Sequence, residues 1–172
     1  MRGEEKSVAR VAMLRFEDVD ELCALAAEIW HAHYPAIISV AQIEYMLRQR
    51  YAPADVRTEL QRGDIWWDQL RVENRMRGFA SYCLIAKAGE MKLDKLYVHQ
   101  DHQRKGYGGM LLDRVATIAR AYGCGTLVLA VNKRNRNAIA AYEKYGFGIT
   151  DAVVKDIGGG FAMDDYVMAR SL

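Results

Sequence analysis

The spacing of apolar residues along the chain alternates between a period of two, typical of strands, and a period near 3.6, typical of helices. Residues 8–16 follow the first pattern and predict a strand with Ala9, Val11 and Met13 on one face. The next segment predicts a helix, with Asp18 or Asp20 as its cap and Pro35 at its end or bend. The apolar face of this helix is expected to hold Val19, Leu22, Leu25, Ala26 and Ile29.

Two shorter helices are predicted before the chain returns to strands. The first carries Ile43, Met46 and Leu47 on its apolar face, and the second covers residues 53–61, with proline as its first residue and Gly63 just past its end. Three strand-like runs follow at residues 64–72, 77–86 and 90–98. Their connections, Asn74-Arg75 and residues 87–89, are short enough for antiparallel hairpins.

The second half of the chain predicts a helix, a strand, a helix and a final hairpin. The long helix at residues 106–122 ends at Gly123, and its expected apolar face holds Leu111, Val115, Ile118, Ala119 and Tyr122. The elements after it are a strand at 126–131, a helix at 137–145 closed by Gly146, and strands at 147–156 and 161–170. This order predicts an α/β protein whose mixed sheet carries helices on its faces.

Composition narrows the class of protein. A chain of 172 residues is expected to form one domain, residues 1–172, and 51% apolar with 27% charged residues is an ordinary globular balance. A net charge of +2 is too small to predict a nucleic-acid partner. No apolar run is long enough for a bilayer, and the first residues lack a secretory core, so we expect no membrane partner. Three widely spaced cysteines, without C-x-x-C, favour a reducing cytoplasm and argue against a metal site.

A glycine-rich loop joins the strand at 90–98 to the long helix. Gly106, Gly108 and Gly109 remove the Cβ atoms that would keep a ligand from the first turn, where about four backbone N–H groups lack helical partners. The segment therefore predicts a phosphate or pyrophosphate site. Tight helix packing is the alternative. A dinucleotide-binding site is disfavoured, because Leu111 stands where its motif needs glycine. The phosphate loop of nucleotide hydrolases is also disfavoured, because its G-K-[ST] sequence is absent.

Gln103-x-x-Gly106-x-Gly108 resembles the [RQ]-x-x-G-x-[GA] motif of the GNAT acyltransferase superfamily. Leu96-Tyr97-Val98 resembles the end of that family's bulged fourth strand, and Val128 to Val131 its fifth, where the two strands splay apart. Residues 137–147 are similar to the following stretch, which ends in Y-x-x-x-G-F. The resemblance covers nearly the whole chain and is strongest from Leu93 to Phe147. Residues 163–168 and Trp30-His-x-His-Tyr34 resemble spermine/spermidine acetyltransferases.

The resemblance implies a mostly antiparallel central sheet with splayed fourth and fifth strands and helices on both faces. It also implies that acetyl-CoA is the donor, and that an amine attacks it directly in a ternary complex without a covalent acyl-enzyme. Many relatives have glycine where this chain has Arg104. Because a positive φ would be costly for arginine, we expect an ordinary backbone conformation there.

The resemblance also assigns candidate residues. Backbone groups of Leu96 and Val98, with Tyr97 between them, are expected to pair with the pantetheine arm, and Asn137, Tyr142 and Lys144 to contact the cofactor. Tyr142 stands at the position of the general acid, and the N–H of Leu96 or Tyr97 is the candidate oxyanion donor. Asp94, Glu90 and His99 remain open as the base. The amides expected to hold the pyrophosphate are those of Gln103, Arg104, Lys105, Gly106, Tyr107, Gly108 and Gly109.

Several of these residues also have a purely structural explanation. Tyr142 could be a packed core tyrosine, the four histidines hydrogen-bonding residues, and Trp66-Trp67 part of the core. Asp164-Asp165 is expected to be a solvated strand end, which would attract a polyamine if it lined the acceptor cleft. The predicted acceptor is a small cationic amine such as a polyamine. The alternatives are a protein N-terminus or lysine, or a CoA-binding sensor without turnover, and a homodimer is possible.

Overall fold

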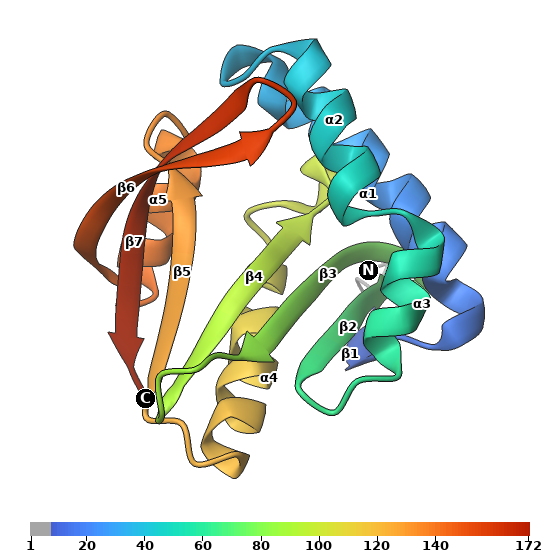
Figure 1. Ribbon diagram of the computed structural model, residues 1–172. Helices are drawn as coiled ribbons and strands as arrows, with labels where there is room; N and C mark the ends of the chain where they lie inside the picture. The colour runs from blue at the N-terminus through green and yellow to red at the C-terminus, as the bar shows by residue number, and fades with distance from the viewer. Residues whose placement is uncertain (1–7) are drawn as a thin grey trace, which may run out of the picture.

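The computed structural model describes residues 8–172, and these form a seven-stranded sheet in the order β1-β2-β3-β4-β5-β7-β6 (Figure 1). β4 and β5 run parallel, and every other neighbouring pair is antiparallel. The strands are β1 (Ala9–Met13), β2 (Ile65–Val72), β3 (Arg75–Leu84), β4 (Glu90–Val98), β5 (Thr126–Asn132), β6 (Gly148–Gly158) and β7 (Phe161–Ser171). The helices are α1 (Val19–His33), α2 (Val40–Arg50), α3 (Pro53–Leu60), α4 (Tyr107–Ala121) and α5 (Arg136–Lys144). The predicted order of elements and the α/β mixed sheet are confirmed.

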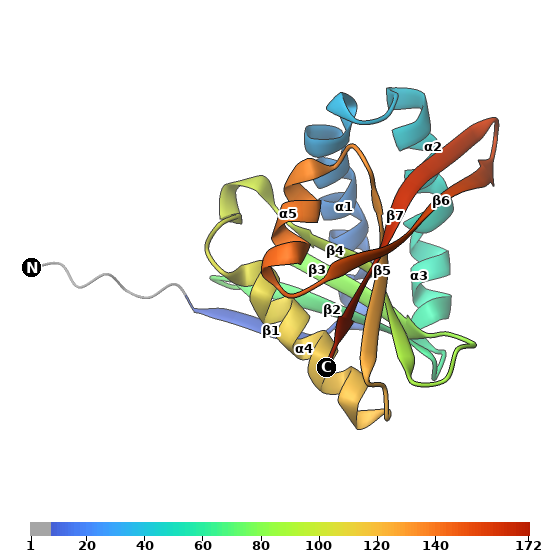
Figure 2. The ribbon, with the colours of Figure 1, turned by 90° about the vertical axis from the view of Figure 1, so that its left-hand side faces the viewer.

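Each face of the sheet carries its own hydrophobic core. α1, α2 and α3 pack against one face around Trp67 and Phe79, and α4 packs against the other around Tyr82 and Leu93, with α5 alongside (Figure 2). Trp66 and Trp67 are neighbours in β2 and therefore enter opposite cores, as predicted. Within residues 8–172, no helix has the length and hydropathy needed to cross a membrane.

Four local predictions are wrong. Met13 and Tyr122 lie at the ends of their elements and are 58% and 52% exposed, so they do not complete the expected apolar faces. The hairpin between β2 and β3 turns at Glu73 and Asn74, one residue earlier than predicted, with both residues at positive φ. Asp18 precedes α1 but its side chain caps nothing, because its carboxylate is held by arginines.

β4 and β5 separate partway along their length. They pair over three positions, from Glu90↔Thr126 to Lys92↔Val128, and no further. Beyond that point β4 stays with β3 as far as Val98, and β5 stays with β7 as far as Asn132. The register of β3 and β4 also shifts next to Asp94, which marks a bulge at the start of the separation. The predicted splay is confirmed, and the predicted bulge is present but lies at Asp94 rather than at Leu96 or Tyr97. Together they open the sheet at its centre.

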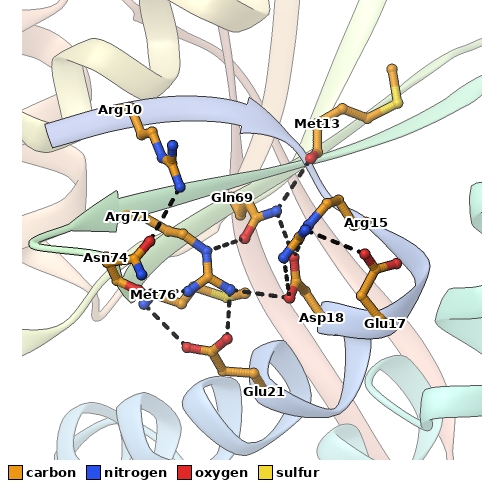
Figure 3. Close-up of polar contacts among 10 residues, drawn as sticks. All are labelled: Arg10, Met13, Arg15, Glu17, Asp18, Glu21, Gln69, Arg71, Asn74 and Met76. Carbon is orange, nitrogen blue, oxygen red and sulfur yellow. Dashed lines mark hydrogen bonds and ion pairs between the residues drawn. The ribbon is translucent and has the colours of Figure 1, made fainter.

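A network of charged side chains ties β1 and β2 to the start of α1 (Figure 3). Asp18 accepts hydrogen bonds from Arg15, at 2.7 and 3.1 Å, and from Gln69 at 3.0 Å. Arg71 lies 3.2 Å from Asp18 and 2.6 Å from Glu21. The hydrogen bond from Arg15 is the main reason that the pKa of Asp18 lies below its ordinary value, although burial opposes the shift.

We expect Asp18→Asn to lower the free energy of unfolding at pH 7 by about 1–3 kcal/mol, the range for hydrogen bonds to charged groups. Because the folded pKa is lowered, this stabilisation exists above the unfolded value of about 3.9 and disappears as pH falls through the folded value. Urea unfolding at pH 7, 5 and 3 measures it. Asp20→Asn, whose side chain is 71% exposed, is the control and should change stability little. A difference between Asp18→Asn and wild type that stays constant down to pH 3 would contradict the assignment.

Candidate active site

The splayed strands open into a cavity of about 560 Å³. Its wall is built from both sides of the sheet, since α1 and α2 reach it from one side and the glycine loop and α5 from the other. Lys105 and Gly109, which were also predicted, lie outside the wall. The predicted residues that line it are Asp94, Leu96, Tyr97, Val98, Gln103, Arg104, Gly106, Tyr107, Gly108, Asn137, Tyr142 and Lys144.

The glycine loop presents unpaired amides at one end of the cavity. Gly106 precedes α4 with a φ of +81°, and its carbonyl accepts the first helical hydrogen bond, from the Met110 N–H at 3.2 Å. The amides just before Met110 therefore have no helical partner. Arg104 has a φ of +59°, so the expectation of an ordinary conformation is wrong. Left-handed residues at 104 and 106 alternate with other conformations in this loop, a backbone pattern from which concave anion-binding arrangements of N–H groups are built.

The three glycines of the loop have different roles. A Cβ on Gly106 would meet nothing within 4 Å, and one on Gly108 would lie 3.9 Å from the Tyr145 hydroxyl. A Cβ on Gly109 would approach that hydroxyl to 3.1 Å. Gly109 is therefore needed for packing against Tyr145, whereas Gly106 and Gly108 keep the mouth of the loop open.

Two polar side chains of the loop are used within the fold. Gln103 donates from Nε2 to the Val98 carbonyl at 3.1 Å, and Lys105 donates from Nζ to the Asp101 carbonyl at 3.2 Å. Gln103 thus ties the loop to the end of β4 and uses one of the two acceptor positions of the Val98 carbonyl.

The open edge of β4 presents the backbone of Leu96. The His99 N–H donates to the Arg77 carbonyl at 2.7 Å, and Tyr97 faces Phe79 in the β3–β4 register. Because hydrogen-bonded pairs recur at every second residue of an antiparallel ladder, the Tyr97 amide turns toward β3. The N–H and C=O of Leu96 then point toward the cavity. This favours the Leu96 N–H over the Tyr97 N–H as the donor to the oxyanion.

Tyr142 lies in the cavity wall near the end of α5. Gly146, at a φ of +90°, ends the helix, and the Phe147 N–H donates to the Tyr142 carbonyl at 3.0 Å. The ring centroids of Phe147 and Tyr142 lie 5.6 Å apart, and this packing fixes the orientation of the Tyr142 ring. Burial raises the pKa of the Tyr142 hydroxyl, and within residues 8–172 no group forms a hydrogen bond with it. Tyr142 therefore stays protonated far above neutral pH with its O–H available.

The three candidate bases are placed very differently. Glu90 pairs with Lys87 at 2.6 Å, where β4 and β5 are still joined, and His99 donates from Nε2 to the Glu28 carboxylate at 2.7 Å; neither Glu90 nor His99 lines the cavity. Asp94 does line it. Burial alone would raise the pKa of Asp94, but three surrounding cations hold it well below its usual range. These cations are Arg50 at 3.1 Å, Lys95 at 2.5 Å and Lys92 at 3.3 Å.

Sequence reasoning missed several residues of the wall. Tyr34 and Arg50 both line the cavity, and the Tyr34 hydroxyl lies 2.8 Å from that of Tyr97. Asp165, which does not line the cavity, was expected to be solvated and is instead only 5% exposed. The correction follows from strand alternation, because Asp164 takes the solvent side, 59% exposed and paired with Lys133, and so turns Asp165 inward. No sequence pattern marked Arg50.

Three of the four histidines form hydrogen bonds, whereas His102 lines the cavity and its buried Nδ1 has no hydrogen-bond partner within residues 8–172. His31 contacts Glu44, His33 lies 3.1 Å from the Asn135 side-chain oxygen, and His99 contacts Glu28. Among the residues that the structure describes, no three His, Cys, Asp or Glu side chains come together to hold a metal ion.

The β6–β7 hairpin closes one end of the cavity region by packing on α2, as Figure 1 shows at the top of the molecule. The Tyr45 hydroxyl donates to the Ile157 carbonyl at 2.8 Å, and the Gln42 amide donates to the Ala162 carbonyl at 3.1 Å. The Tyr45 ring also packs 5.2 Å from that of Phe161. α2 and the hairpin tip therefore cover this end of the cavity region.

Comparison with known proteins gives a consistent result. Residues 20–147 match the family model described as the acetyltransferase (GNAT) family. A spermidine N(1)-acetyltransferase of Thermoplasma acidophilum is 27% identical over 145 residues, which cover 82% of this chain and 89% of the relative. A [ribosomal protein bS18]-alanine N-acetyltransferase of Salmonella typhimurium is 37% identical over 79 residues, which cover 46% of this chain and 52% of the relative.

Solved structures show the same fold. The crystal structure of PaiA N-acetyltransferase from Thermoplasma acidophilum in complex with coenzyme A superposes with a TM-score of 0.83 at 25% identity, covering 96% of this chain and 99% of that one. The ribosomal-protein-S18-alanine N-acetyltransferase from Escherichia coli gives a TM-score of 0.66 at 22% identity, covering 95% and 94%.

Proposed function

The chain belongs to the acetyltransferase (GNAT) family, and from this premise we propose that it transfers the acetyl group of acetyl-CoA to a primary amine of a small cationic molecule such as a polyamine. The observation that carries the proposal is the cavity between β4 and β5, which joins the free amides of the glycine loop to the Leu96 backbone and the Tyr142 hydroxyl. The relative crystallised with coenzyme A supports the donor, and the spermidine-acetylating relative supports the acceptor.

The donor is held by backbone groups in this proposal. The amides from Arg104 to Gly108 bind the pyrophosphate at the positive end of α4. The free peptide groups of Leu96 pair with the pantetheine arm as a neighbouring strand would. Asn137 and Lys144 line the same end of the cavity and add side-chain contacts.

The acetyl thioester supplies an activated carbonyl, and the chain's own groups manage the charge that develops on it. The acceptor nitrogen forms a bond to the carbonyl carbon while the bond from carbon to sulfur breaks. The Leu96 N–H donates to the carbonyl oxygen, a contribution of about 3–4 kcal/mol for one well-placed donor. Tyr142 donates its proton to the departing thiolate, which leaves as the free thiol of coenzyme A, and the proton that the nitrogen loses on becoming the amide returns through water to the Tyr142 phenolate.

The acceptor nitrogen must be neutral before it attacks. For an amine of ordinary pKa near 10.4, losing the proton costs roughly 4–5 kcal/mol at pH 7. Asp94 is too weak a base to take this proton, because its three cations keep it ionised. We therefore propose that Asp94 neutralises Arg50 and Lys95 at the bulge, and that water removes the proton from the amine.

The closed acceptor end favours a small molecule over a protein chain. α2 and the tip of the β6–β7 hairpin are joined over this end by the bonds of Tyr45 and Gln42, and an extended peptide would have to displace them. A location in the cytoplasm and a homodimeric state remain predictions.

A thiol-release assay with acetyl-CoA tests the proposal. We expect release with diamines and polyamines, and little with amino acids, aminoglycosides or short peptides. The kcat/KM should rise about tenfold for each pH unit between pH 6.5 and 8.5, because the fraction of neutral amine rises in that proportion. Binding of coenzyme A without release for any amine would favour the sensor hypothesis instead. A flat pH profile would indicate a protein base that this proposal lacks.

A further inference from the structure

Asp165 is a buried carboxylate without a partner. It lies on β7, opposite Asn132 of β5 and Val153 of β6, and is 5% exposed. Its Oδ1 atom is inaccessible to solvent, and within residues 8–172 no group donates a hydrogen bond to it. Buried polar atoms almost always have a hydrogen-bond partner, and an unpaired buried carboxylate is costly. The missing donor therefore needs an explanation.

The other buried carboxylates all have donors. Asp18 is held by Arg15 and Gln69, and Asp68 accepts a 2.6 Å hydrogen bond from the Tyr82 hydroxyl. Asp94, which is only partly buried with a side chain 23% exposed, is also surrounded by three cations. The fold thus supplies partners wherever a buried carboxylate serves the structure alone, and Asp165 differs from this pattern.

Asp165 does not itself line the cavity but lies next to residues that do. Asn132 and Met163 share its face of the sheet by strand alternation, and both line the cavity. The charged groups that act on Asp165 are Arg50, Lys92, Lys133 and Asp164. Each of the three cations already contacts another carboxylate: Arg50 and Lys92 contact Asp94, and Lys133 contacts Asp164. Burial accordingly raises the pKa of Asp165, in contrast to the lowered pKa of Asp94.

We propose that the missing partner of Asp165 is the second, non-reacting ammonium group of the acceptor, so that the acceptor is a diamine or polyamine. This inference rests on the proposed function. The reacting nitrogen is neutral near Leu96 and Tyr142, while a second nitrogen stays charged and donates to Asp165. Because Oδ1 is covered in the free protein, binding requires a side-chain shift, and Met163 is the flexible neighbour in the wall that allows one.

The test compares 1,4-diaminobutane with n-butylamine, which differ by the second nitrogen. Wild type should prefer the diamine in kcat/KM, and Asp165→Asn should reduce that preference about 10–100-fold, the range for one hydrogen bond to a charged group. The change should lie in KM for the diamine, with kcat and the butylamine reaction nearly unchanged. Asp164→Asn is the matched control, because it removes the same charge one residue away on the opposite face, and it should keep the preference.

Stability separates this role from a structural one. If Asp165 served packing, Asp165→Asn would lower the melting temperature. If Asp165 instead binds a ligand, the variant should melt at the same or a higher temperature than wild type. It should also lose the stabilisation that 1,4-diaminobutane gives wild type in the presence of coenzyme A. An unchanged diamine preference in Asp165→Asn, or an equal loss with both amines, overturns the inference while the proposed function stands. A wild type that acetylates no amine overturns both.

Discussion

Gly108→Glu should abolish binding of coenzyme A measured by calorimetry while leaving the protein folded. The substitution places a carboxylate where the first turn of α4 is expected to hold the pyrophosphate. Two like charges about 4 Å apart repel by about 4 kcal/mol near a protein surface, which corresponds to a loss of affinity of roughly a thousandfold. Without the donor, thiol release should vanish for every amine.

The fold should tolerate this change. Gly108 has no positive φ, and a Cβ there would meet only the Tyr145 hydroxyl, at an ordinary contact distance of 3.9 Å. Gly63→Glu is a matched control, because Gly63 also lacks a positive φ and has nothing within 4 Å. It adds the same bulk and charge away from the loop and should bind coenzyme A as wild type does. Normal affinity in Gly108→Glu would remove the assigned pyrophosphate site.

The sequence predicted the fold well because local patterns and sheet topology agree. Alternating strands, capped helices and short hairpins are read from neighbouring residues, and the separation of β4 and β5 followed from the resemblance at Leu96 and Val128. The errors lie where tertiary contacts override local preference. Asp18 looks like a helix cap, but Arg15 and Arg71 hold its carboxylate instead. Arg104 accepts a left-handed conformation that its side chain disfavours, because the loop around it requires one.

The sequence predicted the residues of the site only where they belong to a contiguous motif. The glycine loop and Tyr142 each belong to a contiguous pattern, so their positions in the cavity wall could be anticipated. Arg50 and Asp165 come from segments more than a hundred residues apart, and only folding brings their charges near each other. Asp94 is a similar case. Three neighbouring cations lower its pKa and make it a weak base, and no local sequence pattern reveals them.

Tyr142→Phe should lower kcat at least tenfold with little change in the affinity for acetyl-CoA. General acid catalysis commonly contributes about 100–10,000-fold, and a thiolate, whose conjugate acid has a pKa of about 8.5, is a fair leaving group without help. The expected loss therefore lies toward the lower end of that range. Because burial raises the pKa of the Tyr142 hydroxyl, wild-type kcat should show no falling limb from this residue up to pH 9.

Phenylalanine keeps the ring that packs against Phe147, and the hydroxyl that it removes has no hydrogen-bond partner in the part of the chain that the structure describes. The melting temperature should therefore change little, which separates a catalytic tyrosine from a structural one. Tyr122→Phe, at a 52% exposed position outside the cavity, controls for loss of a hydroxyl elsewhere. A kcat in Tyr142→Phe equal to that of wild type would mean that the thiolate leaves unprotonated or takes its proton from water, and Tyr142 would then be a packing residue.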